Sequence, residues 1–219
     1  MIAMILAAGR GERMRPLTNT IPKPLLEIRG KPLIVYQIEA LAKAGIKQLV
    51  INTGVMGEKI SQYLGTGEEF GVSIQYSPEG DNPLETAGGI VNALTLLGKD
   101  PFIVTNADIF TDFDYSVLPK KLDMDAHLVL VKNPSHNPDG DFALKKGKIL
   151  NKGEQKYTYS GIGVYSPNLF RECPSGPYPL APLLHCSAQA EQLGGELYSG
   201  VWIDVGTPER LNEININKA

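Results

Sequence analysis

The strongest constraint on the fold is the alternation of short apolar runs with helical patterns in the first half of the chain. Residues 2–7 are almost continuously apolar, which is typical of a strand buried on both faces of a parallel sheet. Gly9 and Gly11 end this run, and Pro32 then begins a segment whose apolar residues recur at helical spacing up to Gly45. Repetition of this unit favours parallel strands joined by right-handed crossovers.

The same pattern continues along the chain. Further strands are predicted at residues 48–52, 72–77 and 101–105, with helices at 59–64 and around 90–97. In the second half we predict a hairpin within 142–150, strands at 157–166 and 196–204, a helix at 180–193 and a last helix from Pro208. The sequence therefore predicts an α/β fold with a Rossmann-like mixed, mainly parallel sheet and helices on both faces. We expect one domain, 1–219.

Charge and composition exclude several function classes. Residues 1–31 hold six basic and two acidic residues, although the 219-residue chain has a net charge of −3. A basic segment in an acidic protein indicates a local anion site and not a nucleic-acid surface. The apolar run at the start is too short to span a membrane, and it lacks the basic leader of a signal peptide. The only cysteines, Cys173 and Cys186, form no CxxC pair. We expect a cytoplasmic protein that binds neither nucleic acid nor membrane.

A glycine- and arginine-rich loop follows the first strand and reads AAGRGERMRPLT. Glycines at this position allow the backbone to approach a phosphate closely. A dinucleotide-binding fingerprint would place a third glycine at the start of a helix, but position 14 is Met and Arg15-Pro16 follows. The Gly-Lys-Ser/Thr of a Walker loop is also missing. Arginines, which can donate two hydrogen bonds to one phosphate, are present instead.

Three further residues are candidates for chemistry because of their positions. Lys23 lies between Pro22 and Pro24, whose fixed φ angles give it a stiff mount. Asp108 and Asp204 each follow an apolar strand, where a carboxylate could hold a hard cation. The three histidines, His127, His136 and His185, are isolated in sequence, and we expect them to be structural or solvated.

In an open parallel sheet, ligands bind beyond the carboxyl ends of the strands. This rule predicts that residues 8–15, 78–89 and 106–108 meet around one binding site. Each element alone is common in proteins without such a function, since glycine turns, surface lysines and capping aspartates are frequent. The prediction therefore rests on their combination.

The motifs LAAGRGERMRPLT, PKPLLEI, NADI and WIDVGTP, in this order, resemble the sugar-phosphate nucleotidylyltransferases over nearly the whole chain. Within that family, YSPEG, PLETAGGI, LAPLL and the short chain are most similar to the N-acetylmuramate 1-phosphate uridylyltransferases of peptidoglycan recycling. The resemblance implies a nucleotide-binding half, 1–110, and a sugar-phosphate-binding half, 111–219.

The resemblance also implies roles for individual residues. Arg13 and Lys23 would be catalytic, and Asp108 and Asp204 would hold Mg²⁺. The implied nucleotide-binding residues are Ala8, Gly9, Gly11, Arg13, Lys23, Glu79, Glu85, Thr86, Gly88 and Asn106. The implied sugar-binding residues are Gly140, Asp141, Thr158, Tyr159 and Gly161. Two departures from the family are visible: Glu85 replaces a glycine, and Asn151-Lys152-Gly153 stands where many relatives have Glu-Lys-Pro.

The resemblance thus implies transfer of UMP from UTP to a sugar 1-phosphate, with N-acetylmuramate 1-phosphate favoured, releasing pyrophosphate. The alternative within the same chemistry is a mannose 1-phosphate guanylyltransferase or another sugar 1-phosphate nucleotidyltransferase. From a different class, the chain could be a catalytically silent regulator that binds nucleotide sugars. Retention of Arg13, Lys23, Asp108 and Asp204 argues against the silent protein, because binding alone would not need all four. The sequence implies no protein partner.

Overall fold

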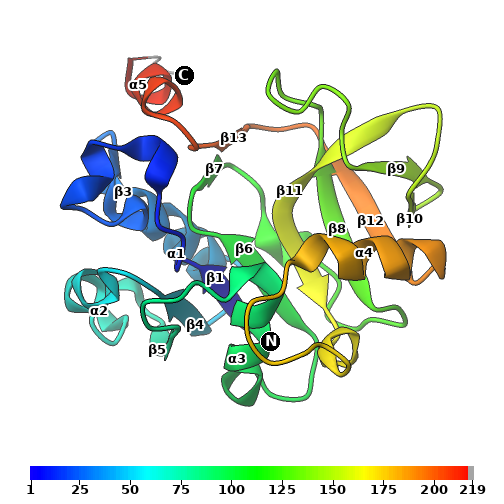
Figure 1. Cartoon of the computed structure of the whole chain (residues 1–219), viewed down its shortest axis with the longest axis horizontal. Helices are drawn as coiled ribbons and strands as arrows, with labels where there is room; N and C mark the ends of the chain where they lie inside the picture. Colours follow the sequence, from blue (N-terminus) through cyan, green and yellow to red (C-terminus); the bar gives the residue numbers. More distant parts are fainter. Residues whose placement is uncertain (217–219) are drawn as a thin grey trace.

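The computed structural model describes residues 1–216, and its main feature is a nine-stranded mixed sheet built from both halves of the chain (Figure 1). The strand order is β5-β4-β1-β6-β11-β8-β12-β10-β9. The first half supplies β1 (Ile2–Leu6), β4 (Gln48–Thr53), β5 (Ser73–Pro78) and β6 (Phe102–Asn106). The second half supplies β8 (Ala126–Val131), β9 (Phe142–Lys145), β10 (Lys148–Leu150), β11 (Lys156–Tyr165) and β12 (Leu193–Tyr198).

Helices cover both faces of this sheet, as predicted. The helices are α1 (Leu33–Lys43), α2 (Gly57–Leu64), α3 (Glu85–Leu97), α4 (Leu180–Gln189) and α5 (Pro208–Ile216). Because side chains alternate along a strand, Ala3 and Ile5 pack with α1 and α2 in one core, whereas Met4 packs with α3 and α4 in the other. Burial on both faces explains why these strands are apolar at nearly every position. No helix within residues 1–216 is long and apolar enough to span a membrane.

The sheet changes from parallel to antiparallel between β6 and β11. Strands β5, β4, β1 and β6 are all parallel, whereas β11 pairs antiparallel with β6, β8 and β9. Among the described residues of the second half, only β8 and β12 are parallel to each other. Gly161, with φ +79°, lies at an irregularity in β11 where the register with β8 shifts. The predicted mixed sheet is confirmed, and its parallel part belongs mostly to the first half.

The structure differs from the sequence prediction at three elements of the second half. Strand β8 was not predicted, although its sequence AHLVLV is apolar and buried. The predicted helix 180–193 ends at Gln189, because Glu191 adopts a left-handed φ of 56° and the chain then enters β12. The predicted strand 196–204 is two strands, since the chain turns at Gly200 before β13 (Trp202–Asp204). The predicted hairpin at Lys146-Gly147 is confirmed between β9 and β10.

Two small sheets lie outside the main sheet, and a third apolar core brings α5 beside the early part of the chain. Strand β13 pairs antiparallel with β7 (Ile109–Thr111), and β2 (Glu27–Ile28) pairs with β3 (Lys31–Pro32). A third apolar core packs α5 against the loops that follow β1: Leu211 and Ile214 lie with Met14, Ile28 and Val205. The C-terminal helix is therefore held against the segment that carries the glycine- and arginine-rich loop.

A buried hydrogen-bond network fixes the segment that follows β6. Gln37 of α1 is 1% exposed, and its Nε2 donates to the carbonyl of Ile109 at 2.7 Å. Its Oε1 accepts from Thr105 at 3.3 Å and from the Tyr115 hydroxyl. Burial raises the pKa of Tyr115 above its ordinary value, so this phenol remains a neutral donor. The network ties the end of β6, and hence Asp108, to α1.

Candidate active site

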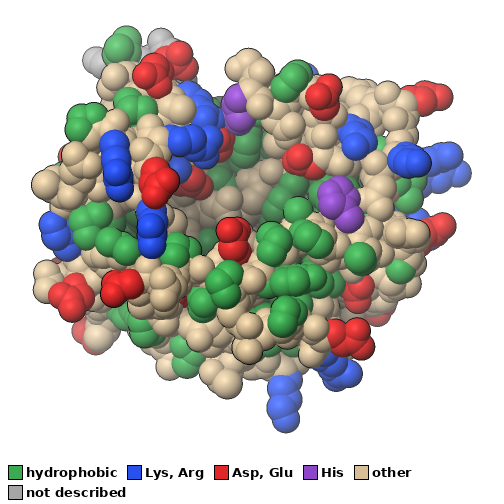
Figure 2. Space-filling model, viewed as in Figure 1, with side chains coloured by type: hydrophobic (Ala, Val, Ile, Leu, Met, Phe, Trp, Pro, Cys, Tyr) green, Lys and Arg blue, Asp and Glu red, His purple; other side chains and the backbone are tan. Residues whose placement is uncertain are grey.

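A cavity of about 490 Å³ lies at the carboxyl ends of the parallel strands, where the three predicted loops meet. Figure 2 shows a hollow near the middle of this face, with Lys and Arg side chains gathered along its left side. The structure thus brings together ten of the predicted residues in the lining of one cavity: Ala8, Gly9, Gly11, Arg13, Lys23, Glu79, Glu85, Thr86, Asn106 and Asp108.

The glycine- and arginine-rich loop turns sharply at Gly11. This residue has φ +63°, and a Cβ there would lie 3.0 Å from Cγ2 of Thr18 and 3.1 Å from Cβ of Lys23. The Thr18 hydroxyl donates to the Gly11 carbonyl at 2.8 Å, which closes the turn. After it, Met14 is buried as an anchor, whereas Arg13 is exposed and lines the cavity. The local sequence therefore fixes the backbone and leaves the Arg13 side chain exposed in the cavity lining.

Lys23 reaches the cavity from a short 3₁₀ helix, Lys23–Leu25, that Pro22 and Pro24 frame. Both prolines are buried, and the lysine side chain is only 12% exposed. Its Nζ forms an ion pair with Oδ2 of Asp108. The stiff mount predicted from the sequence is confirmed, and the structure adds its partner.

Asn52 is a cavity residue that the sequence analysis missed. Its Oδ1 accepts a hydrogen bond from the Ala7 amide at 2.7 Å, and its Nδ2 donates to Oε1 of Glu79 at 2.6 Å. The second carboxylate oxygen of Glu79 accepts from the Leu84 amide at 3.0 Å. Asn52 therefore joins the loops after β1 and β5. The available signal was a polar residue ending the apolar run QLVIN.

Glu85, Gly88 and Gly89, at the start of α3, differ in their contacts with the cavity. Glu85 lines the cavity with φ +59°, a conformation that costs an ordinary residue about 1–2 kcal/mol and that glycine adopts freely. Gly88 does not contribute to the cavity lining; a Cβ there would lie 2.3 Å from the Gly176 carbonyl oxygen. A Cβ on Gly89 would lie 2.4 Å from Oε1 of Glu79, so this glycine allows the carboxylate to pack against the helix.

Asp204 lies beside Asp108 although 96 positions separate them in the sequence. The amide of Val205 donates to the carbonyl of Asp108 at 2.8 Å, and Asp204 is paired with Ile109 in the β7–β13 ladder. Oδ1 of Asp204 forms an ion pair with Nη1 of Arg210 and lies 3.2 Å from Nε2 of His136. His136 is isolated in the sequence, but in the structure it lies beside Asp204.

The two aspartates suit a divalent cation in their ligand type. Each uses one carboxylate oxygen for a basic side chain, and within residues 1–216 neither Oδ1 of Asp108 nor Oδ2 of Asp204 accepts a hydrogen bond. Hard cations such as Mg²⁺ are commonly held by one or two carboxylates, with water and substrate phosphates completing the shell. The described residues contain no cluster of three or more His, Cys, Asp or Glu side chains, so a metal here would need such outside ligands.

The predicted sugar-binding residues lie outside the cavity lining and are linked to one another. Asp141 accepts from the Tyr159 amide at 2.8 Å and from Asn137 at 3.2 Å. The Thr158 hydroxyl donates to Asn133 at 3.0 Å and accepts from Asn137 at 3.1 Å. The Tyr159 hydroxyl lies 2.6 Å from that of Tyr165. Their role in sugar binding stays a prediction.

Gly161 connects this group to the nucleotide side. A Cβ at Gly161 would lie 2.6 Å from Nδ2 of Asn106, which lines the cavity.

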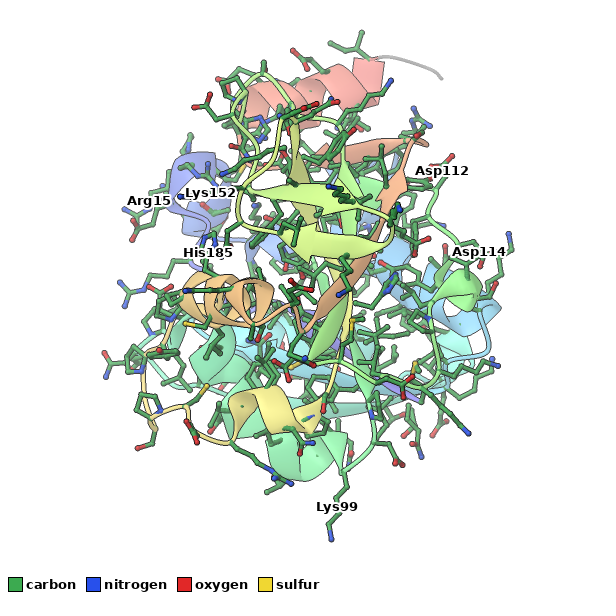
Figure 3. All side chains as sticks on the ribbon, turned by 90° about the vertical axis from the view of Figure 1, so that its right-hand side faces the viewer. Arg15, Lys99, Asp112, Asp114, Lys152 and His185 are labelled. Atoms are coloured by element: carbon green, nitrogen blue, oxygen red, sulfur yellow. The ribbon has the colours of Figure 1, made fainter. Side chains whose placement is uncertain are left out.

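Asn151, beside Lys152, donates from Nδ2 to the His185 carbonyl at 2.9 Å, and its Oδ1 lies 2.7 Å from Nδ1 of that ring. In Figure 3, Lys152 and His185 are labelled close to each other on the left of the view, and Asp112 and Asp114 on its right.

Comparison with known proteins places these features in a family. Residues 2–144 match the family described as Nucleotidyl transferase. The chain is 48% identical to an N-acetylmuramate alpha-1-phosphate uridylyltransferase of Neisseria meningitidis serogroup B, over 97% of this chain and 96% of that protein. It is 33% identical to the protein of that name from Caulobacter vibrioides (95% and 93%). It is 31% identical to a mannose-1-phosphate guanylyltransferase catalytic subunit beta of Danio rerio (95% and 62%).

A solved structure has the same fold. HddC from Yersinia pseudotuberculosis, complexed with GMP-PN, superposes with a TM-score of 0.76 at 22% identity, over 98% of this chain and 97% of that one. The cavity at the strand ends, the four motifs and the relatives all indicate the same family. The chain belongs to the nucleotidyl transferase family, among the enzymes that act on sugar 1-phosphates.

Proposed function

We propose that this enzyme transfers UMP from UTP to N-acetylmuramate 1-phosphate, releases pyrophosphate and depends on Mg²⁺. The observation that carries the proposal is the convergence of Arg13, Lys23 and Asp108 on one glycine-lined cavity. Such a site supplies phosphate donors and a carboxylate for a cation at the same place.

The reaction requires neutralisation of charge more than proton transfer. An oxygen of the sugar 1-phosphate attacks the α-phosphorus of the nucleotide, and the bond from that phosphorus to the bridging oxygen breaks as pyrophosphate leaves. The attacking oxygen is already ionised, so no general base is needed. Two unit charges about 4 Å apart repel by about 4 kcal/mol at a surface-like dielectric. Arg13 and Lys23 offset this repulsion and the charge that moves to pyrophosphate.

Bound Mg²⁺ would add positive charge at the phosphates and orient them. Asp108 and Asp204 would hold it, and their ion pairs with Lys23 and Arg210 orient both carboxylates. Lys23 Nζ lies against Asp108, so the cation and the lysine would act on the same phosphates. Asn52 would hold the loops after β1 and β5 in register around the nucleotide.

The choice of base and sugar rests on the relatives. The 48% identical Neisseria protein is a uridylyltransferase for N-acetylmuramate 1-phosphate, and it is matched over almost its full length. The second candidate function is a mannose 1-phosphate guanylyltransferase, which the 31% identical Danio rerio relative favours. That protein extends well beyond the region matched by this chain.

A pyrophosphate-release screen tests these proposals together. Four NTPs are crossed with the 1-phosphates of N-acetylmuramate, N-acetylglucosamine and mannose, with Mg²⁺ and with EDTA. We expect UTP with N-acetylmuramate 1-phosphate to have the highest kcat/KM, and EDTA to abolish turnover. Preference for GTP with mannose 1-phosphate would establish the second candidate. Absence of turnover with every pair, together with binding of a nucleotide sugar, would identify a silent regulator.

A further inference from the structure

We propose that Arg210 is a positioning residue of the metal site: it fixes the Asp204 carboxylate through Oδ1 and so leaves Oδ2 to a divalent cation. This inference rests on the Mg²⁺ site proposed above. Arg210 lies outside the four motifs that define the site in the sequence, and it does not contribute to the cavity lining.

The contacts of Asp204 divide between its two oxygens. Nη1 of Arg210 donates to Oδ1, and Nε2 of His136 lies 3.2 Å from the same oxygen. Within residues 1–216, Oδ2 accepts no hydrogen bond. The side chains of Arg210 and Asp204 are 18% and 24% exposed, so the pair is largely shielded from water. A shielded, charge-assisted contact restricts rotation of the carboxylate more than a surface pair would.

The backbone next to Asp204 is shaped to admit the guanidinium group. A Cβ at Gly206 would lie 2.6 Å from Nη2 of Arg210 and 3.2 Å from Oδ2 of Asp204. The φ of Gly206 is outside the left-handed region, so the requirement for glycine at this position is spatial. Gly206 lines the cavity, whereas Asp204 and Arg210 do not; the pair adjoins the cavity through its contact with Gly206.

The helix that carries Arg210 is itself anchored. The Arg210 amide lies 3.4 Å from Oγ1 of Thr207, and the Leu211 amide donates to the Thr207 carbonyl at 3.1 Å. Leu211 and Ile214 are buried in the third core with Val205. Because the helix and the strand end share this core, the backbone of Arg210 is held close to Asp204. The guanidinium has only to keep one side-chain conformation to stay in contact with the carboxylate.

Outer residues that hydrogen-bond a metal ligand orient it, and losing one typically weakens metal binding by about 10- to 100-fold. The charge of Arg210 acts in the opposite direction, because a nearby positive group repels a cation. The sign of the change on removing Arg210 therefore separates the two roles. If Arg210 positions Asp204, removing Arg210 weakens cation binding. If Arg210 instead occupies the place of the cation, removing it tightens cation binding.

The experiment measures Mn²⁺ binding without nucleotide, by electron paramagnetic resonance of the free ion, for wild type and for Arg210→Ala, Arg210→Lys and Gly206→Ala. We expect Arg210→Ala to raise the Mn²⁺ Kd by about 10- to 100-fold. Arg210→Lys, which keeps a charged donor, should give an intermediate value. Gly206→Ala should resemble Arg210→Ala because its methyl group displaces the guanidinium, and the double variant should be no worse than either single one.

Lys148→Ala is the matched control, since it breaks an exposed ion pair with Glu191. It should leave the Mn²⁺ Kd unchanged, and thermal unfolding checks that each variant is folded. If Arg210→Ala does not fold, Gly206→Ala and Arg210→Lys carry the test. An unchanged or lower Kd in folded variants lacking the contact overturns the role of Arg210 alone. If wild type shows no Mn²⁺ binding that Asp108→Asn or Asp204→Asn weakens, the metal site and this inference both fail.

Discussion

The two sides of the site are built differently. On the nucleotide side, side chains from loops after parallel strands converge on one cavity, as Arg13 and Lys23 do. On the second-half side, the polar atoms of Asp141 and Thr158 hydrogen-bond Tyr159, Asn133 and Asn137. Parallel strands place all their following loops at one edge, whereas antiparallel strands send alternate loops to opposite ends. The side chains of the first side therefore line a shared cavity, whereas those of the second hold their own loops in shape.

The largest expected effect is on the nucleotide side. Lys23→Ala should lower kcat by about 100- to 1,000-fold, because its charge is needed most as pyrophosphate departs. Asp108→Asn should cause a loss of similar size through the cation. Steady-state kinetics at varied UTP measures both changes. Lys31→Ala, which removes an exposed ion pair with Glu39, is the control and should retain normal turnover. A change in KM alone would make Lys23 a simple binding group.

The next effect tests the contact between the two sides of the site, where Gly161 lies against Asn106. Gly161→Ala should destabilise the fold by about 2–3 kcal/mol, because φ is +79° and the new methyl group would meet Asn106. Urea unfolding measures the free energy of unfolding. Gly45→Ala is the matched control: its φ is +82° and a Cβ there has no neighbour within 4 Å, so only the backbone cost of about 1 kcal/mol applies. Equal losses would show that contact with Asn106 has no energetic role.

A smaller effect is expected on the sugar side. Thr158→Val removes the hydroxyl that links Asn133 and Asn137 while keeping the side chain's shape. The predicted result is a loss of about tenfold in kcat/KM for the sugar 1-phosphate, equal to about 1.4 kcal/mol, with KM for UTP unchanged. Varying each substrate at saturation of the other separates the two constants. An equal change for both substrates would remove the distinction between the two sides.

The smallest effect concerns Glu85. Glu85→Gly relieves a left-handed conformation but adds freedom to the unfolded chain, so stability should rise by only about 0.5 kcal/mol. Lys146→Gly makes the same change at φ 52° in the β9–β10 hairpin. We expect both variants to unfold slightly later in urea, but only Glu85→Gly to lose activity, because Glu85 lines the cavity. Full activity of Glu85→Gly would leave its strained conformation without a functional reason.

The success of the sequence prediction also differs between the two sides. In the first half, strands buried on both faces are apolar at nearly every position, so strands and loops could be located within a few residues. In the second half, short and partly exposed strands such as β10 and β13 gave weaker patterns, and the predicted strand 196–204 proved to be two. Strand β8 was missed although it is apolar and buried like the strands of the first half. Two of the residues missed at the site, Asn52 and His136, contact partners distant in the sequence. Arg210 lies six positions from Asp204, and residue spacing alone does not show that their side chains meet.

The sequence by itself determined the parallel half, the glycine- and arginine-rich loop, the lysine between two prolines and the two aspartates at strand ends. These follow from local rules: which residues can be buried, which φ angles proline and glycine allow, and where parallel strands end. Only the tertiary structure decided that Lys23 pairs with Asp108 and Arg210 with Asp204, and that Gly206 leaves space for a guanidinium. The first pairing joins residues 85 positions apart, and the second depends on how α5 packs against Val205, next to Asp204. Hydrophobic packing of that kind has no signature in residue spacing, because it joins segments that the chain brings together only on folding.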